Sequence, residues 1–398
     1  MKKVLVLMLS LLMAMMCLAG CGASSGNAGD VDGNVIKIGV FEPATGPNGA
    51  GGKQEVLGIK YANEMQPTVE INGEEYAVEL VEVDNESDNS KAVTAAQSLV
   101  SSDVSVVLGS YGSGVSIAAG STFKDAGIPA IGISCTNQQV TSDCDVYFRI
   151  CFLDPFQGKI LASYAYENGM RKAYCLSQLG DDYSVNLVGC FQTAFEELGG
   201  EVVKAEQFQV NNTNFNSFIE NAKSAGADVF FSPVDINSAQ YIIDQADALS
   251  LNMPILAGDT WDNNKVAASA KDKGVEVTCS TFFAADLNDE AATFDTNIKE
   301  WINSDSDRLT ANGDDDTIAA VTALGYDAYN VALEAIKAAG SADPADILAA
   351  LPGVTYTGIT GSVAFDELGD VAKDSVIFKT IDTASGTWKF LKEQQLVG

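Results

Sequence analysis

The sequence contains no histidine among its 398 residues. This absence excludes every mechanism that needs an imidazole, including Ser–His–Asp triads, Cys–His dyads and zinc sites with histidine ligands. Basic residues are also scarce, because 23 Lys and Arg stand against 54 Asp and Glu and leave a net charge of −31. Phosphate backbones repel so acidic a chain, and we therefore expect no nucleic-acid partner.

Several motifs that carry chemistry are missing as well. No Cys-x-x-Cys pair is present, which argues against a zinc ribbon or a thioredoxin-like site. No Gly-x-Gly-x-x-Gly opens the first helix, and the sequence has neither a P-loop nor a Gly-x-Ser-x-Gly elbow. We therefore expect no metal, no cofactor and no enzymatic activity, with a hydrolase that uses a pair of carboxylates as the open alternative.

Long apolar runs are confined to the N-terminus. Two lysines precede an apolar run from Val4 to Leu18, which is too short for a membrane span and is typical of a secretory signal. The stretch 18–21, Leu-Ala-Gly-Cys, resembles the processing box of bacterial lipoproteins. We expect residues 1–20 to be a signal peptide and Cys21 to carry the lipid. The alternative is an ordinary signal peptide with a chance cysteine.

Residues 21–34 are rich in Gly, Ser, Asn and Asp and poor in apolar side chains. This composition predicts a flexible tether that holds a folded body off the membrane. Two or three acyl chains are enough for stable anchoring. The sequence therefore predicts an extracytoplasmic protein that is anchored to the bacterial cell membrane through lipid at Cys21.

Six cysteines remain in the body of the chain. Export permits disulfides, and Cys135 and Cys144 flank an eight-residue loop that would let them pair. Cys175 lies in a strand pattern and Cys190 in a helix pattern, where small buried hydrophobic residues are common. We favour free buried thiols with at most one disulfide.

From residue 35 onward, short apolar segments alternate with helical ones. The segments 35–41 and 104–110 are rich in β-branched residues and are typical of buried strands, whereas 89–102 and 113–127 carry apolar residues at helical spacing. This alternation predicts parallel sheets covered by helices. The strands are too many for one sheet, so we expect the chain to enter a second lobe at 145–158.

The last third of the chain departs from this rhythm. Helices are expected at 290–303, 316–338 and 344–351, followed by a strand pair at 361–366 and 375–391.

Several sequence segments occur in an order that is more specific for a protein family than any one segment. They run from about 35 to 391 and include IKIGVFEPATGPNGAGG (36–52), VEVDNESDNSKAVTAAQSLVSSDVSVVLGSYGSGVS (81–116), GIPAIGISCTNQQVTSDCDVYFRICFLDPFQG (127–158), MPILAGDTWD (253–262) and GITGSVAFDELGD (358–370). In this order the chain resembles the leucine/isoleucine/valine-binding family, type I solute-binding proteins that deliver ligands to ABC importers.

The resemblance implies an α/β fold with two doubly wound parallel-sheet lobes, joined by three crossings and closing on a ligand between them. It implies that residues 35–152 and 282–374 form the first lobe. Residues 153–281 and 375–398 would form the second.

Two loops are candidates for holding a carboxylate. In open parallel sheets, ligands bind beyond the carboxyl ends of the strands. Residues 110–113 follow one predicted strand, and Ser134, Cys135 and Thr136 follow the next. Free N–H groups at a helix N-terminus suit an anion, and Ser113 and Thr136 would add hydroxyls. The alternative is that these hydroxyls only cap helices.

Asp259 is the candidate for holding an ammonium group. It follows the predicted strand 254–258 in the second lobe, and a buried ammonium needs a paired, hydrogen-bonded anion. The resemblance supports this role, because amino-acid binders of the family carry an acidic residue here. The alternative is an exposed loop acid. Tyr183 and Trp261 are candidates for apolar walls or a hydroxyl donor, against ordinary packing.

One position departs from the family pattern. Members that bind branched aliphatic amino acids often carry an aromatic residue in the first loop, where this chain has Gly51. Loss of the ring enlarges the pocket and admits a bulkier or more polar amino acid. Tyr111 and Phe282 are candidates to fill the space instead.

The function predicted is therefore capture of an amino acid, branched-chain or related, and its delivery by a monomer to the membrane subunits of an ABC importer. A small carboxylate or amide ligand is an alternative. A ligand-sensing receptor of the same fold is another, but such receptors continue into a membrane span. The sequence ends at Gly398 without one, which favours a free-standing binding protein.

Overall fold

The computed structural model describes residues 34–395 of the chain. The predicted signal peptide, Cys21 and the tether up to residue 33 lie outside the described residues. Within 34–395, every helix is too short or too polar to cross a membrane.

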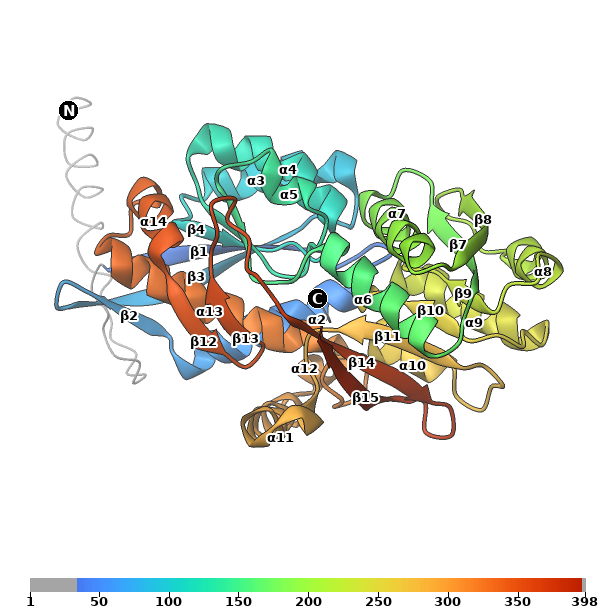
Figure 1. Ribbon diagram of the computed structural model, residues 1–398. Helices are drawn as coiled ribbons and strands as arrows, with labels where there is room; N and C mark the ends of the chain where they lie inside the picture. Colours follow the sequence, from blue (N-terminus) through green and yellow to red (C-terminus); the bar gives the residue numbers. More distant parts are fainter. Residues whose placement is uncertain (1–33, 396–398) are drawn as a thin grey trace, which may run out of the picture. The chain divides into compact units, whose positions relative to one another are not determined.

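The first sheet has six strands in the order β2-β3-β1-β4-β5-β6 (Figure 1). Neighbouring strands are parallel except for β2 and β3. The three-residue strands β4, β5 and β6 are entirely buried, as expected when helices cover both faces of a parallel sheet. The bounds are β1 (Val35–Glu42), β2 (Thr68–Ile71), β3 (Glu74–Asp84), β4 (Val106–Leu108), β5 (Ala130–Gly132) and β6 (Tyr147–Arg149).

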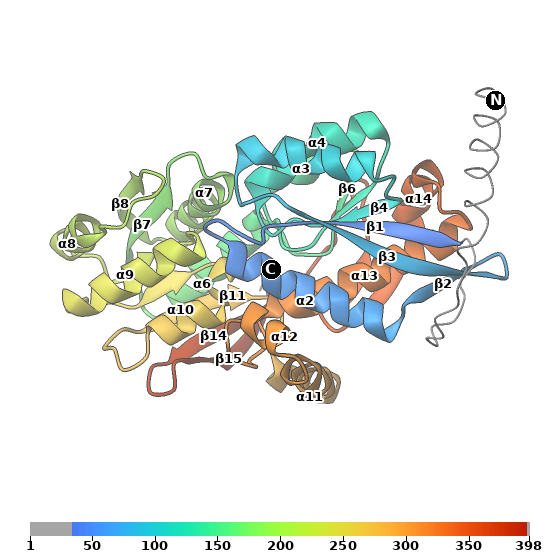
Figure 2. The ribbon, with the colours of Figure 1, turned by 180° about the vertical axis from the view of Figure 1, so that it is seen from behind.

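Helices α3 (Asn89–Ser101) and α4 (Ser113–Ala126) cover one face of this sheet, and α2 (Gly49–Met65) and α13 (Ala320–Ala339) cover the other (Figures 1 and 2). Two glycines let α2 and α13 approach closely. A Cβ on Gly58 would lie 1.9 Å from the carbonyl oxygen of Thr322, and one on Gly325 would lie 2.2 Å from that of Glu55. This close packing fixes the position of Glu55 in the first lobe.

The second sheet has seven strands in the order β15-β14-β11-β10-β9-β7-β8. The strands from β11 to β8 are parallel, and β14 and β15 extend the sheet antiparallel. The bounds are β7 (Lys172–Gln178), β8 (Glu201–Phe208), β9 (Val229–Phe231), β10 (Ile255–Ala257), β11 (Val277–Thr281), β14 (Ser375–Asp382) and β15 (Thr387–Gln395).

Helices also cover both faces of the second sheet. One core cluster joins it to α6 and α7, and another joins it to α8, α9 and α10. The bounds are α6 (Asp154–Glu167), α7 (Asp182–Glu197), α8 (Asn216–Ser224), α9 (Ile236–Ala248) and α10 (Asn264–Ser269). We call the first sheet with its helices the first lobe, and the second sheet with its helices the second lobe.

The chain passes between the lobes three times, at 150–153, 282–284 and 365–374. The predicted class, α/β with two doubly wound lobes joined by three crossings, is confirmed. The lobe boundaries at 152/153, 281/282 and 374/375 stay a proposal, which these passages support. The remaining elements are α5 (Gln139–Ser142), α11 (Asp289–Asn303), α12 (Ser306–Ala311), α14 (Pro344–Ala350), the 3-10 turns at 259–261, 285–287 and 351–353, and the hairpin β12 (Thr355–Gly358) with β13 (Gly361–Ala364).

The predicted strand pair at 361–366 and 375–391 is wrong. β13 pairs with β12, and β14 pairs with β15, so the region forms two hairpins. The range 375–391 contains the second turn, where the N–H of Gly386 donates to the carbonyl of Asp382 and Gly386 has a φ of 75°. Glycine adopts that backbone conformation without strain, which lets the strand reverse.

All six cysteines of the described body are free. Cys135 and Cys144, which the loop length would have allowed to pair, remain separate thiols. The Cys144 thiol lies 3.5 Å from the carbonyl oxygen of Gly120, and Cys135 packs in the core beneath α4. Cys175 is buried as expected, while Cys190 is half-buried.

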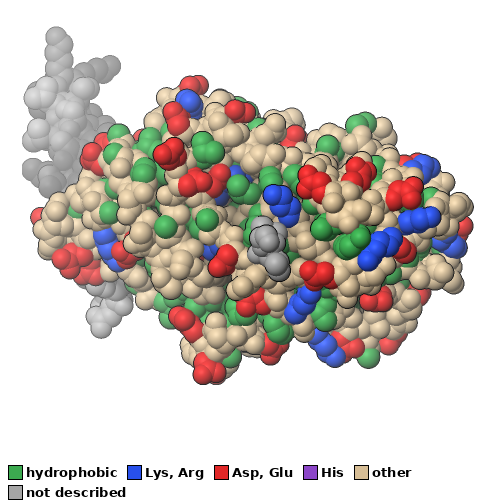
Figure 3. Space-filling model, viewed as in Figure 1, with side chains coloured by type: hydrophobic (Ala, Val, Ile, Leu, Met, Phe, Trp, Pro, Cys, Tyr) green, Lys and Arg blue, Asp and Glu red, His purple; other side chains and the backbone are tan. Residues whose placement is uncertain are grey.

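Acidic side chains are spread over the face drawn in Figure 3, with basic side chains between them. Exposed ion pairs contribute little to stability, but two pairs are buried. Arg149 of β6 bonds Asp370 at 2.8 Å, and Lys379 of β14 bonds Asp262 at 2.9 Å. Each pair ties a late segment of the chain to an earlier one, and loss of one partner would leave an uncompensated buried charge.

Candidate functional site

Two loops of the first lobe meet at the carboxyl ends of β4 and β5. The loop 109–112 leads into α4, whose first residue is Ser113, and the loop 133–138 follows β5. The backbone N–H of Asn137 donates to the Ser113 hydroxyl at 3.2 Å, which joins the two loops. The structure therefore brings together the residues that the sequence proposed for a carboxylate.

Within the loop 133–138 the predicted residues differ in orientation. The Ser134 hydroxyl donates to Glu55 of α2. The Cys135 thiol packs in the core with Phe123, and burial raises its pKa to about 11. The Thr136 hydroxyl is buried and lies beside the Asp154 carboxyl.

Asp154 begins α6 and is entirely buried next to Thr136. Its Oδ2 accepts a hydrogen bond of 2.6 Å from the side-chain amide of Asn186. Burial raises the pKa of Asp154 to about 7, while the bonds from Thr136 and Asn186 lower it. The Asp154 carboxyl beside Thr136 is therefore partly protonated near pH 7.

The Tyr111 ring lies over Gly51, the position at which the resemblance to the family implied an aromatic residue. A Cβ on Gly51 would lie 2.4 Å from Cε2 of the Tyr111 ring. The Tyr111 hydroxyl donates to the carbonyl of Thr260, in the second lobe, at 3.1 Å. Phe282, the other candidate to fill this space, instead stacks on Phe152 with ring centroids 4.1 Å apart.

Asp259 lies directly after β10 in the second lobe and is 2% exposed. Its Oδ1 accepts two hydrogen bonds of 2.8 Å, from the amide of Gln157 and from the hydroxyl of Tyr183. Burial raises the pKa of Asp259 to about 6, and the two hydrogen bonds oppose that rise. A Cβ on Gly258 would lie 2.2 Å from the Tyr183 hydroxyl, so glycine leaves room for this contact.

Trp261 is part of the core of the second lobe. Its side chain is fully buried, and its indole N–H donates to the carbonyl of Val234 at 3.1 Å. The same carbonyl accepts a bond from the Thr260 hydroxyl. Trp261 thus holds the segment that carries Asp259 against the end of β9.

The two lobes contact each other through polar groups around these residues. The Asn137 amide donates to the carbonyl of Asp182 at 2.8 Å, and the Asn89 amide donates to the Asp182 carboxylate at 3.3 Å. Gln138 and Asn186 exchange two amide hydrogen bonds. Water can replace such bonds when the lobes separate, so opening at this edge has a low cost.

A small cavity of about 50 Å³ remains between the facing loops. Pockets that hold small ligands usually measure about 300–1,000 Å³, so a ligand of that size needs the facing loops to move apart. Of the predicted residues, Tyr111, Ser113 and Tyr183 line the cavity. Its other walls are Pro43, Asn48, Ser87, Asn89, Gly112, Gly114, Val115, Asp181, Asp235 and Thr260.

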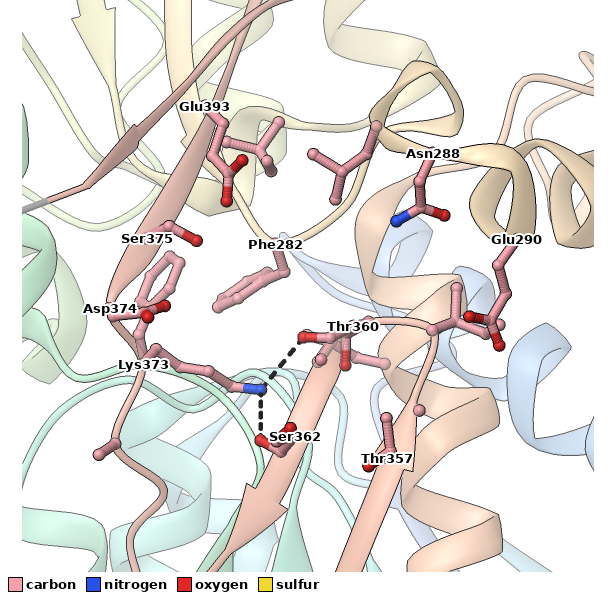
Figure 4. A pocket seen from close by; sticks show the side chains of 18 residues that line it. Phe282, Asn288, Glu290, Thr357, Thr360, Ser362, Lys373, Asp374, Ser375 and Glu393 are labelled. Atoms are coloured by element: carbon pink, nitrogen blue, oxygen red, sulfur yellow. Dashed lines mark hydrogen bonds between the residues drawn. The ribbon is translucent and has the colours of Figure 1, made fainter.

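A larger cavity, of about 620 Å³, lies at the crossings instead (Figure 4). Phe152, Phe282 and Lys373 line it, one from each crossing. The Lys373 ammonium donates to the carbonyls of Thr360 and Ser362 at 3.1 and 3.2 Å. Of the residues that the sequence singled out, only Phe282 lines this cavity.

Sequence reasoning missed two buried acids of the site, Glu42 and Glu55. Glu42 is the last residue of β1, so the argument that selected Asp259 at the end of β10 applies to it equally. Glu55 lies inside α2, where a charged residue in a helical pattern usually faces solvent. Its burial depends on Gly325 and Ser134, which are remote in sequence.

The two lobes and the facing loops between them define the class of the protein, a two-lobed binding protein. The model of the periplasmic binding protein family matches residues 35–384, and the chain belongs to that family. These are solute-binding proteins of ABC transporters, and membership implies a location outside the cytoplasm.

Relatives cover nearly the whole chain. It is 27% identical over 364 residues to Leu/Ile/Val-binding protein homolog 1 of Brucella suis, an alignment that spans 90% of this chain and 94% of the relative. The structure of the leucine-binding protein LivK from Thermotoga maritima is similar, with a TM-score of 0.81, 30% identity and coverage of 91% of this chain and 99% of that one.

A second solved structure is similar over the same extent. It is the branched-chain amino acid transporter substrate-binding protein LivJ from Streptococcus pneumoniae in complex with isoleucine. Its TM-score is 0.78 and its identity 25%, and the match covers 91% of this chain and 99% of that one.

Proposed function

We propose that the protein binds an amino acid between its lobes and delivers it to the membrane subunits of an ABC importer. The observation that carries this proposal is the buried carboxyl of Asp259, which Gln157 and Tyr183 orient through bonds of 2.8 Å. A desolvated ammonium needs such a partner. The names of two similar proteins, Leu/Ile/Val-binding protein homolog 1 and the leucine-binding protein LivK, support the same ligand class.

The ligand's carboxylate would lie across from Asp259, at the loops of the first lobe. Ser113 begins α4, so the free N–H groups of the first helical turn point toward the cavity that Ser113 lines. Thr136 would supply a second hydroxyl, and Ser134 and Cys135 would present their backbone. This half of the site needs hydrogen-bond donors rather than a cation, because donors at a helix terminus already favour an anion.

The side chain of the ligand is less constrained by these groups. Tyr111 restores an aromatic wall over Gly51, but Asn48, Ser87 and Asn89 make the remaining cavity polar. This lining supports a search that extends from branched-chain amino acids to polar ones.

We also propose that the protein is a monomeric lipoprotein held at the membrane by lipid on Cys21. The signal-like run and the Leu-Ala-Gly-Cys box of residues 18–21 support this. Replacing Cys21 by Ala should leave an unprocessed precursor without lipid. A variant that is still acylated would contradict the anchoring residue.

Two measurements test the ligand class. Native mass spectrometry of the purified full chain should show a retained small molecule, and calorimetric titration with the twenty amino acids should identify at least one that binds. Benzoate and simple carboxylates serve as comparison ligands. Binding of these carboxylates with no binding of any amino acid would replace the proposal by a small-carboxylate binding protein.

A further inference from the structure

Two buried carboxyl groups stand behind the loops that would receive the ligand's carboxylate. Glu42, at the end of β1, accepts a hydrogen bond of 2.8 Å at Oε2 from the backbone N–H of Tyr111. Glu55, in α2, accepts one at Oε1 from the Ser134 hydroxyl. Each carboxyl group therefore holds one of the two loops with one oxygen.

The second oxygen of each group has no donor. Glu42 Oε1 and Glu55 Oε2 are buried without a partner among the described residues. The Glu42 and Glu55 carboxyl groups act directly on each other, through their charges and a side-chain hydrogen bond. Two carboxylates cannot satisfy one another because neither has a hydrogen, but one added proton makes a bond that satisfies both oxygens.

The surroundings contain further acids. Tyr111 and Cys135 act on the pair from the loops of the first lobe, and Asp259 acts on Glu55 from the second lobe. Tyr147 and Asp262 are other acidic groups nearby. Burial, and then the mutual charge, raises the pKa of Glu42 well above its usual range, and burial raises that of Glu55 to about 8.

The bases around the pair leave it unneutralised. Arg149 of β6 donates to the carbonyls of Cys135 and Asn137 in the loop 133–138, and its ion pair is with Asp370. Lys53 and Lys60 of α2 share the wall of a neighbouring cavity with Glu42, which Glu82 and Asp84 also line. The Lys60 ammonium bonds Glu82 at 2.9 Å instead. The ion pairs of the described residues include none with Glu42 or Glu55.

We propose that Glu42 and Glu55 share one proton and act as positioning residues that hold the loops 109–112 and 133–138 in the shape that receives the ligand's carboxylate. This use of the pair rests on the proposed function; the shared proton itself rests on the geometry. With one proton the pair carries a single negative charge and stays together. Loss of the proton leaves two adjacent charges, which separate, move both loops and repel an incoming carboxylate.

The proton can be observed without any ligand. Infrared spectra of the full chain at pH 7 should contain a protonated-carboxyl band that is weaker in Glu55→Gln, and this difference should shrink as the pH rises through about 8. The amide of the glutamine can still accept from Ser134 and donate to Glu42, so the variant keeps the shape of the site. Identical spectra for the two proteins at pH 7 would overturn the shared proton. Glu42→Gln provides a second variant if Glu55→Gln fails to fold.

The positioning role is tested by affinity against pH, with L-leucine as the first probe. The Kd of the parent should rise about tenfold between pH 7 and pH 9. The Kd of Glu55→Gln should rise less than twofold over the same range. Titration of the ligand's own ammonium affects both proteins equally, so the comparison removes it.

Glu79→Gln is the matched control, because it removes the same charge from an exposed position of β3 in the same lobe. It should follow the parent. Equal pH dependence in the parent and in Glu55→Gln would overturn the positioning role. If neither leucine nor any other amino acid binds the parent, the proposed function fails, while the infrared comparison still decides the shared proton.

Discussion

The two sides of the site both bury carboxyl groups, but they surround them differently. Asp259 in the second lobe receives two hydrogen bonds from neutral donors, Gln157 and Tyr183. Glu55 in the first lobe receives one from Ser134 and otherwise faces Glu42. Both groups are buried, yet burial raises the pKa of Asp259 to about 6 and that of Glu55 to about 8.

The difference shows that depth of burial alone does not set the charge of a carboxyl group. Donors on the charged form stabilise it, and a second carboxyl destabilises it. At neutral pH the second lobe therefore presents the anion that the proposed ammonium site needs. The first lobe presents donors, behind which the acid pair keeps a proton.

The largest expected effect is on stability against pH. A carboxyl whose pKa is raised by folding binds more protons in the folded than in the unfolded state, so stability falls as pH rises toward the folded pKa. The Asp259 contribution to stability should therefore be lost between pH 3.8 and about pH 6, and the Glu55 contribution between pH 4.5 and about pH 8. The shift at Asp259 alone corresponds to about 3 kcal/mol.

Chemical denaturation of the parent, Asp259→Asn and Glu55→Gln between pH 4 and pH 8 checks this. Asp259→Asn should flatten the profile below pH about 6, and Glu55→Gln should flatten it up to pH about 8. A parent that gains stability from pH 5 to pH 8 would contradict both assignments.

Next in size is the effect of Asp259→Asn on ligand binding. The change removes the charge and keeps the shape, and charge-assisted hydrogen bonds contribute about 1.5–3 kcal/mol. Affinity for the bound amino acid should fall about 10- to 100-fold. Titration calorimetry at pH 7 gives the number, with Asp272→Asn, at an exposed site of the same lobe, as control. An unchanged affinity would remove Asp259 from the ammonium site.

A substitution at Gly109 should disturb the packing around Glu42 in the first lobe. A Cβ there would lie 2.6 Å from Glu42 Oε1 and 2.4 Å from the carbonyl oxygen of Phe41, at a φ of 121°. We expect Gly109→Ala to lower the free energy of unfolding by about 1–3 kcal/mol. Gly73→Ala is matched in having a positive φ, 86°, with nothing within 4 Å of the added atom. Equal losses in the two variants would show that the contact with Glu42 does not affect the free energy of unfolding.

The smallest expected effect belongs to Ser113→Ala. One neutral hydroxyl is lost, together with its bond from the N–H of Asn137, but the backbone donors at the start of α4 remain. A hydrogen bond of this kind contributes about 0.5–1.5 kcal/mol, so affinity should fall about 2- to 10-fold. If calorimetry shows a larger loss of affinity in Ser113→Ala than in Asp259→Asn, the larger contribution assigned to Asp259 is wrong.

Local patterns were sufficient to predict the alternating part of the fold. The short strands are buried on both faces and therefore appear as unbroken apolar runs, and the helices between them carry apolar residues at regular spacing. The C-terminal hairpins were harder, because 375–391 holds both a strand and a turn. There the position of Gly386 decides where the strand reverses, and no apolar period marks it.

The site divides in the same way. Residues at the carboxyl ends of strands, such as Ser113, Ser134 and Asp259, follow from topology alone. Glu55 does not, because its partner Ser134 lies 79 positions further along the chain. A burial that depends on contacts between such distant segments has no local signature, so the acid pair became visible only in three dimensions.

The packing of α2 against α13 also bears on how the protein reaches its destination. Gly58 and Thr322 touch across 264 positions (322 − 58) of intervening chain. The face of the first sheet that α2 and α13 cover cannot be completed until α13 (Ala320–Ala339) has emerged from the ribosome, and contacts of such long range form slowly. A polypeptide that must thread through a membrane channel benefits from this delay, since it stays extended until most of its length has crossed. The order of segments along the chain thereby delays completion of the first lobe until most of the chain is available.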